Sequence, residues 1–170
     1  VGTEDDGYRQ YNIGGRARSR LTDALSLTGN ARYSRGKVDL DGFPPPNYTF
    51  ADADIHERLE AWSTRVGALY ETEALTLNAG FAISDSDRVG DDPDFPYTIK
   101  GRSERIELLG RVKLPSEFAL DFGADHEWTR FSNAPSAGKA EISSAHALIG
   151  YYGERLTLTA GARIDDHSTF

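Results

Sequence analysis

Five aspartates lie close together in the segment "SDSDRVGDDPDF", which covers residues 84–95. They are Asp85, Asp87, Asp91, Asp92 and Asp94. Calcium prefers several carboxylate oxygens as ligands, and a glycine such as Gly90 permits the turn that a binding loop needs. The spacing departs from the EF-hand loop, which needs a glutamate at its twelfth position. The segment therefore predicts either a calcium site or an acidic, solvated loop.

A second segment, "DGFPPPNYTFADADIHE" at residues 41–57, has residue types that suit a ligand-binding surface. Its three consecutive prolines stiffen the backbone, and rigid aromatic rings lose little conformational entropy on binding. The candidate contact residues are Asp41, Phe43, Tyr48, Phe50, Asp52 and Asp54. The same rings could instead pack against neighbouring loops, so both interpretations stay open.

The histidines offer no catalytic motif. His56, His126, His146 and His167 are scattered over separate segments, without the spacing that places two zinc ligands on one helix face. The run Asp165-Asp166-His167 has acidic and basic groups but no identifiable nucleophile. We therefore expect a protein that is not an enzyme and that needs no cofactor. Calcium, at the acidic segment, is the one candidate ion.

Composition limits the possible classes of protein. The chain has 170 residues, a formal net charge of -8 and a pI of about 5.0, which argues against nucleic acid as a partner. No apolar run is long enough for a transmembrane helix, and the mean hydropathy is -0.53. Cysteine and methionine are absent. We expect residues 1–170 to be a single segment excised from a longer mature protein.

Four segments share one layout, an apolar–polar–apolar triplet followed by a glycine. They are "LSLTGNARY" (25–33), "LTLNAGFAI" (75–83), "FALDFGADH" (118–126) and "LTLTAGARIDDHSTF" (156–170). Each follows a short turn and a second glycine-containing strand, at 11–21, 62–70, 104–114 and 143–152. The other connections, roughly 36–57, 86–102 and 132–141, are long and polar. This arrangement predicts an all-β, antiparallel up-and-down segment of eight strands in four hairpins.

Alternation along these strands predicts one apolar and one polar face, because successive side chains of a strand point to opposite sides. Leucine, valine and phenylalanine side chains collect on one face, and Arg32, Arg65, Glu107, Asp125 and Arg163 belong to the other. Seven aromatic residues lie towards strand ends: Tyr33, Trp62, Tyr70, Trp128, Phe131, Tyr151 and Tyr152. Membrane barrels place aromatic residues at both interfaces, which favours lipid on the apolar face and water on the polar face. A soluble eight-stranded binding barrel and a passive small outer-membrane barrel remain alternatives.

These motifs resemble TonB-dependent outer-membrane receptors of Gram-negative bacteria. "LTLTAGARIDDHSTF" is similar to a barrel strand in which Leu-Thr-Gly-x-Arg-x-Asp-Asp-His-x-x-Phe is common. "DGFPPPNYTFADAD" (41–54) looks like an extracellular loop of the cobalamin-receptor-like branch, and "GRVKLPSEFALDFGADHEWTRF" (110–131) is similar to hairpins of the same barrels.

The resemblance implies a bacterial outer-membrane location and a receptor that binds and imports a scarce nutrient such as a siderophore or cobalamin. It also implies a barrel of about twenty-two strands around a plug that contacts an inner-membrane energy-coupling protein. Neither the plug nor its coupling box is in this sequence. We therefore expect a partial barrel with two exposed sheet edges, membrane lipid on one face and the nutrient at the outer loops.

Overall fold

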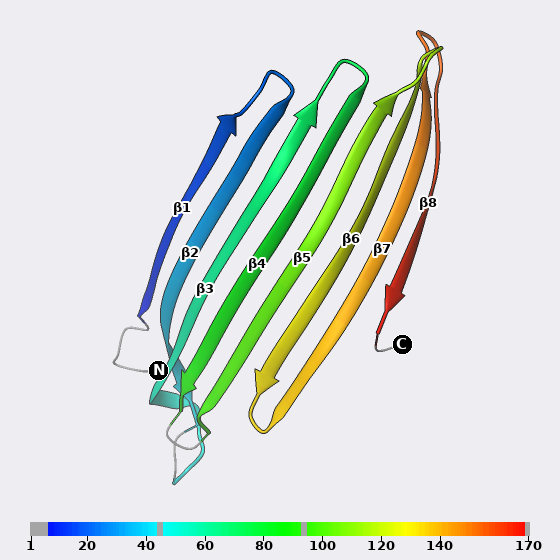
Figure 1. Cartoon of the computed structure of the whole chain (residues 1–170). Helices are drawn as coiled ribbons and strands as arrows, with labels where there is room; N and C mark the ends of the chain where they lie inside the picture. Colours follow the sequence, from blue (N-terminus) through cyan, green and yellow to red (C-terminus); the bar gives the residue numbers. More distant parts are fainter. Residues whose placement is uncertain (1–6, 44–45, 93–94, 169–170) are drawn as a thin grey trace.

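The computed structural model describes residues 7–43, 46–92 and 95–168, which form one antiparallel sheet (Figure 1). The strands are β1 (Tyr8–Arg20), β2 (Leu25–Gly42), β3 (Ala51–Glu71), β4 (Leu75–Asp91), β5 (Tyr97–Lys113), β6 (Phe118–Asn133), β7 (Ser136–Tyr152) and β8 (Thr157–His167). Each strand pairs with its neighbours in the chain, so the predicted up-and-down order is confirmed. β1 and β8 lie at opposite sides of the sheet, and the described residues show no pairing between them.

Tight turns join the strands at one end of the sheet, as the sequence predicts. They cover residues 21–24, 72–74, 114–117 and 153–156. In two of them a threonine orders the turn: the Leu25 amide donates to Thr22 Oγ1 at 3.0 Å, and the Leu75 amide donates to Thr72 Oγ1 at 3.1 Å. A side-chain oxygen of this kind gives the backbone a local hydrogen-bond partner, which favours the turn.

At the other end the strands are longer than the sequence predicts. β2, β4 and β6 continue to Gly42, Asp91 and Asn133, and the connections that remain there cover 43–50, 92–96 and 134–135. The prediction of long loops was therefore wrong. Apolar–polar alternation reveals a strand only where one face is shielded from water. Where both faces are wet, the backbone still pairs but the side-chain pattern is lost.

The strands are staggered. The row of paired residues through Leu25, the first residue of β2, reaches Leu77, the third of β4, and Phe122, the fifth of β6. The register thus advances by two residues with each hairpin. A sheet closes into a barrel when its strands tilt by roughly 35–45° and their register shifts steadily. This sheet therefore has the geometry of a piece of barrel wall.

The strand register sorts the side chains into the two faces that alternation predicts. The apolar face includes Leu27, Val66, Phe81, Leu108, Ala124, Ile149 and Ile164, and the polar face includes Arg32, Arg65, Asn78, Glu107, Asp125 and Arg163. Arg65 and Glu107 keep 25% and 19% of their side-chain surface exposed, whereas their chain neighbours Val66 and Ile106 are each 54% exposed. Side chains crowd on the inside of a curved sheet and spread apart on the outside. We infer that the polar face is the concave one.

Aromatic side chains form two rows on the apolar face. The near aromatic row, beside the tight turns, contains Tyr70, Phe118 and Tyr151, and the far aromatic row contains Tyr33, Trp62 and Trp128. The interval from Trp62 to Tyr70 covers nine residues of β3, and that from Phe118 to Trp128 covers eleven residues of β6. Phe131 and Tyr152 also lie near strand ends, but they belong to the polar face and not to these rows.

The sheet has almost no buried apolar interior. Among the described residues, Ala119 is the one buried hydrophobic residue, with 7% of its surface exposed, and no large side chain is fully buried. A soluble sandwich or soluble barrel encloses its apolar face in a packed core. The described residues form a single sheet, and they place no second layer over its apolar face. Within the described ranges no helix is long and apolar enough to cross a bilayer, a finding that does not bear on crossing by strands.

Candidate functional site

Ion pairs join four adjacent strands across the polar face. We call this set the polar ladder: Asn78, Arg65, Glu107, Arg105 and Asp125. Arg65 on β3 donates from Nε to Glu107 Oε1 on β5 at 2.8 Å and from Nη2 to Asn78 Oδ1 on β4 at 3.0 Å. Arg105 Nε lies 3.7 Å from Glu107 Oε2, and Arg105 Nη2 lies 3.2 Å from Asp125 Oδ1 on β6. Alternating charges are therefore fixed in place on the concave side of the sheet.

Gly80 leaves room for the contact between Arg65 and Glu107, which lie on strands that are not adjacent. Arg65 must cross β4 to reach β5, and Gly80 lies between Gly67 on β3 and Glu107 on β5 in the register. A Cβ atom at Gly80 would lie 2.5 Å from Arg65 Nη2 and 2.7 Å from Arg65 Cζ, which is too close for a real side chain. The guanidinium of Arg65 thus occupies the space that the missing Cβ leaves.

We expect Gly80→Ala to push Arg65 away from Glu107 and to lower the free energy of unfolding by about 1–2 kcal/mol, the cost of a disturbed charged hydrogen bond. The matched control is Gly29→Ala, whose new Cβ would have Arg65 O as its nearest neighbour at 4.0 Å and should change stability by less than about 0.5 kcal/mol. Urea unfolding in lipid vesicles measures both. Equal effects of the two variants would contradict the role given to Gly80.

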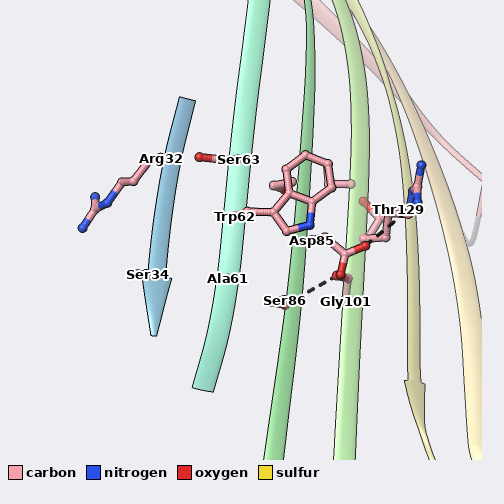
Figure 2. Close-up of a pocket in the computed structure, with 12 residues that line it drawn as sticks. Arg32, Ser34, Ala61, Trp62, Ser63, Asp85, Ser86, Gly101 and Thr129 are labelled. Carbon is pink, nitrogen blue, oxygen red and sulfur yellow. Dashed lines mark hydrogen bonds and ion pairs between the residues drawn. The ribbon is translucent and has the colours of Figure 1, made fainter. Parts of the chain in front are cut away.

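A hollow of about 530 Å³ lies on the polar face beside the ladder (Figure 2). Hydroxyl side chains from β2 to β6 dominate its lining: Ser34, Ser63, Ser84, Ser86, Ser103 and Thr129. Trp62, Asp85 and Arg102 also border it, although alternation directs their side chains to the other face. Hydroxyl groups both donate and accept hydrogen bonds. The hollow can therefore hold water or the hydroxyl and amide groups of a polar molecule.

The predicted calcium ligands on β4 do not converge. Asp85, Asp87 and Asp91 follow one another along one side of the strand, and each faces a cation of a neighbouring strand. The pairs are Asp85–Arg102 at 4.0 Å, Asp87–Lys100 at 3.2 Å and Asp91–Arg58. These carboxylates are therefore already partly neutralised by basic side chains.

The remaining two acidic residues lie in the connection after β4. Asp92 Oδ1 accepts a hydrogen bond from the Phe95 amide at 3.1 Å, and Asp94 lies outside the described residues. Within the described ranges, no three or more acidic, histidine or cysteine side chains are grouped so that they could hold a metal ion. Since Asp94 belongs to the proposed ligand set, the calcium site stays a prediction.

The aromatic candidates lie in the connection between β2 and β3. The rings of Phe43 and Phe50 contact each other edge to face, with centroids 5.6 Å apart, and remain 62% and 65% exposed. Tyr48, with a φ of 51°, is exposed as well. Asp41 belongs to β2 and has an interaction partner. Asp52 and Asp54 belong to β3, with side chains outside the described ones. The connection thus presents a small aromatic surface, and its role in binding stays a prediction.

Asp39 lies beyond the far aromatic row, where Lys37 Nζ and His56 Nδ1 approach Asp39 Oδ1 at 3.0 and 2.7 Å. The hydrogen bond from Lys37 lowers the pKa of the Asp39 carboxyl and outweighs desolvation, which would raise it. The charges of Lys37 and His56 lower this pKa further. A lowered pKa in the folded state stabilises the fold above the unfolded-state pKa. That contribution is lost as the pH falls through the folded-state pKa.

We expect Lys37→Gln to raise the pKa of Asp39 towards its ordinary value, as measured by carboxyl NMR titration. Lys139→Gln, on a distant strand, is the control and should leave this titration unchanged. A pKa of Asp39 that does not respond to the loss of Lys37 would contradict the assignment.

Neither the polar ladder nor the hollow could be predicted directly from the sequence. Their residues were assigned to the polar face, but which of them meet depends on the register between strands. The repeated glycine within each strand was the available signal, since a glycine inside a strand often marks close approach by another group. Gly80 marks the crossing of Arg65.

No protein-family model matches the sequence, and no curated protein sequence matches it. Solved structures do match. The siderophore receptor PirA from Pseudomonas aeruginosa is 18% identical, with a TM-score of 0.79 over 96% of this chain and 28% of its own. The ferric enterobactin receptor PfeA of the same organism, in complex with enterobactin, is 17% identical, with a TM-score of 0.74 over 99% of this chain and 30% of its own.

The alcaligin outer-membrane receptor FauA from Bordetella pertussis is 15% identical, with a TM-score of 0.70 over 95% of this chain and 29% of its own. The chain thus spans less than a third of the length of each of these receptors. Identities this low establish the fold and not the ligand. The chain has the fold of a β-barrel wall segment, as found in these outer-membrane siderophore receptors.

Proposed function

We propose that this chain forms part of the membrane-spanning wall of a bacterial outer-membrane receptor that imports a scarce nutrient. The observation that carries the proposal is the uncovered apolar face between two aromatic rows. The rows enclose nine residues of β3 and eleven of β6, and a tilted strand needs about 9–11 residues to cross a bilayer. Aromatic residues favour both membrane interfaces, because their rings suit headgroup depth.

In this proposal the polar face lines the aqueous interior of the barrel. The polar ladder supplies charges of both signs there, which suits a wet lumen and not a lipid-facing surface. The strands continue beyond the far aromatic row towards the cell exterior, and the connection with Phe43 and Phe50 lies at their end. Nutrient capture at this outer end is a binding function without catalysis.

The structural neighbours support a siderophore-like ligand, since they include receptors for ferric enterobactin and alcaligin. Cobalamin remains the alternative from the sequence resemblance. Import against a gradient needs energy, which we assign to an inner-membrane partner acting through a plug inside the barrel, in the manner of TonB-dependent receptors. This chain would then supply wall, lumen lining and part of the ligand entrance.

The other two candidate functions fit less well. A soluble binding barrel would enclose its apolar face, yet that face is open here. A passive eight-stranded membrane barrel would need β1 to pair with β8, and the described residues show an open sheet with these strands at its two sides (Figure 1).

Uptake by iron-starved cells that carry the intact receptor tests the proposal. We expect radioactive iron supplied as a catecholate or hydroxamate siderophore to enter, and the variant Phe43→Ala with Phe50→Ala to reduce that uptake at least tenfold. The matched control is Phe95→Ala, another exposed ring in an outer connection. Receptor abundance in the outer-membrane fraction should be equal for all forms. Absence of the receptor from that fraction would contradict the location. Uptake of cobalamin without uptake of siderophore-bound iron would contradict the siderophore ligand and assign cobalamin in its place.

A further inference from the structure

Three cations lie side by side on β5, β6 and β7, on the same side of the sheet as the apolar face. We call them the cation row: Arg102, Arg130 and Lys139. The register places Arg102 directly opposite Arg130, and Arg130 directly opposite Lys139. All three residues are exposed. Like charges directly opposite each other on neighbouring strands destabilise a sheet. A negatively charged group beside the row would offset this repulsion.

Several other cations on this side of the sheet have carboxylate partners, in the pairs Lys37–Asp39 at 3.0 Å, Lys100–Asp87 at 3.2 Å and Arg58–Asp91. Within the row, Arg102 pairs with Glu104 at 2.8 Å. In the described part of the chain, by contrast, Arg130 and Lys139 have no carboxylate within 4.0 Å. Glu141, the next acidic side chain along β7, lies opposite Trp128 in the register. Two of the three charges therefore have no counterion among the described residues.

The cation row lies immediately outside the far aromatic row. Trp128 and Arg130 are two residues apart on the same side of β6, a step of about 7 Å along the strand. If the apolar face contacts lipid, as the proposed function states, Trp128 marks the membrane interface. Arg130 and Lys139 then lie at the depth where lipid headgroups present their phosphates.

We propose that the cation row binds the phosphate group of a membrane lipid whose acyl chains lie on the apolar face below it. Arginine donates two parallel hydrogen bonds to phosphate oxygens, and lysine adds a third cationic donor. The apolar residues below Trp128 on β5, β6 and β7, among them Ile106, Ala124 and Ile149, offer a surface for the chains. This inference rests on the proposed function and adds a specific lipid contact to it.

Native mass spectrometry of the intact receptor in detergent, with added phosphatidylglycerol, tests the proposal. We expect Arg130→Gln with Lys139→Gln to weaken phosphatidylglycerol binding roughly tenfold or more, from the loss of charge-assisted hydrogen bonds. The control is Lys37→Gln with Arg58→Gln, which also removes two cations that face each other on this side of the sheet, and should change binding less than twofold. If the first double variant does not fold, Lys139→Gln alone should weaken binding about threefold.

Three outcomes would overturn the proposal: equal loss in the control, equally tight binding of diacylglycerol, or no loss on removing Arg130 and Lys139. Complete competition by equimolar inorganic phosphate would reassign the row to free phosphate. These outcomes are separable from failure of the proposed function, which would appear as absence of the receptor from the outer-membrane fraction.

Discussion

Placing an arginine at Val66 should destabilise the protein in a bilayer by about 2–4 kcal/mol. Val66 lies on the apolar face of β3, midway between Trp62 in the far aromatic row and Tyr70 in the near one. It is 54% exposed, so the larger side chain meets no steric obstacle from this chain. The cost therefore comes from bringing a charge to the middle of the hydrocarbon layer.

The control for Val66→Arg is Thr98→Arg, on the same side of the sheet but near the outer end of β5. That site lies outside the hydrocarbon layer, where the same charge should cost about 0–1 kcal/mol. Urea unfolding of both variants in vesicles measures the difference. Equal costs at the two depths would show that the apolar face does not contact lipid.

Removing the carboxylate of Glu107 should have the second largest effect. Arg65 and Arg105 both approach Glu107, at 2.7 and 3.7 Å, and its side chain is only 19% exposed. Without it, two arginines remain close together on the crowded concave face. We expect Glu107→Ala to lower the free energy of unfolding by about 1–3 kcal/mol, less than the loss for a fully buried pair because water still reaches the site.

The matched control is Glu71→Ala, which breaks another arginine–glutamate pair of the polar face. Arg18 and Glu71 lie 2.8 Å apart but keep 53% and 49% of their side-chain surfaces exposed. Exposed pairs contribute about 0–1 kcal/mol, so this variant should be nearly neutral. A double-mutant cycle between Arg65 and Glu107 measures their coupling directly. Equal losses at Glu107 and Glu71 would show that the polar ladder does not stabilise the wall.

The half of the sheet near the tight turns was predictable from sequence, and the outer half was not. Between the aromatic rows one face is apolar, so Leu75, Leu77, Ala79 and Phe81 alternate with polar or glycine positions and reveal both the strand and its facing. From the far aromatic row outwards, Asp85 and Asp87 belong to the same side as those leucines, and the pattern disappears although the strand continues to Asp91.

The candidate sites divide in the same way. Alternation assigned Arg65 and Glu107 to one face, because the side of the sheet to which a side chain points depends on local sequence. Their contact across β4 could not be predicted, since it depends on the register of three strands and on the space at Gly80. The acidic segment was interpreted from its residue types and their spacing along the chain. Strand geometry then separated Asp85, Asp87 and Asp91 along one strand and placed each of them beside a cation.

The most direct test of the central claim uses two consecutive leucines of β5. Leu108 belongs to the apolar face and Leu109 to the polar face, yet both are 42% exposed. This chain has no cysteine, so one can be introduced at either position and labelled with an environment-sensitive fluorophore. In vesicles that contain a lipid-borne quencher, we expect quenching at position 108 and not at position 109. Equal quenching at both positions, or quenching at 109 alone, would contradict a barrel wall whose apolar face contacts lipid.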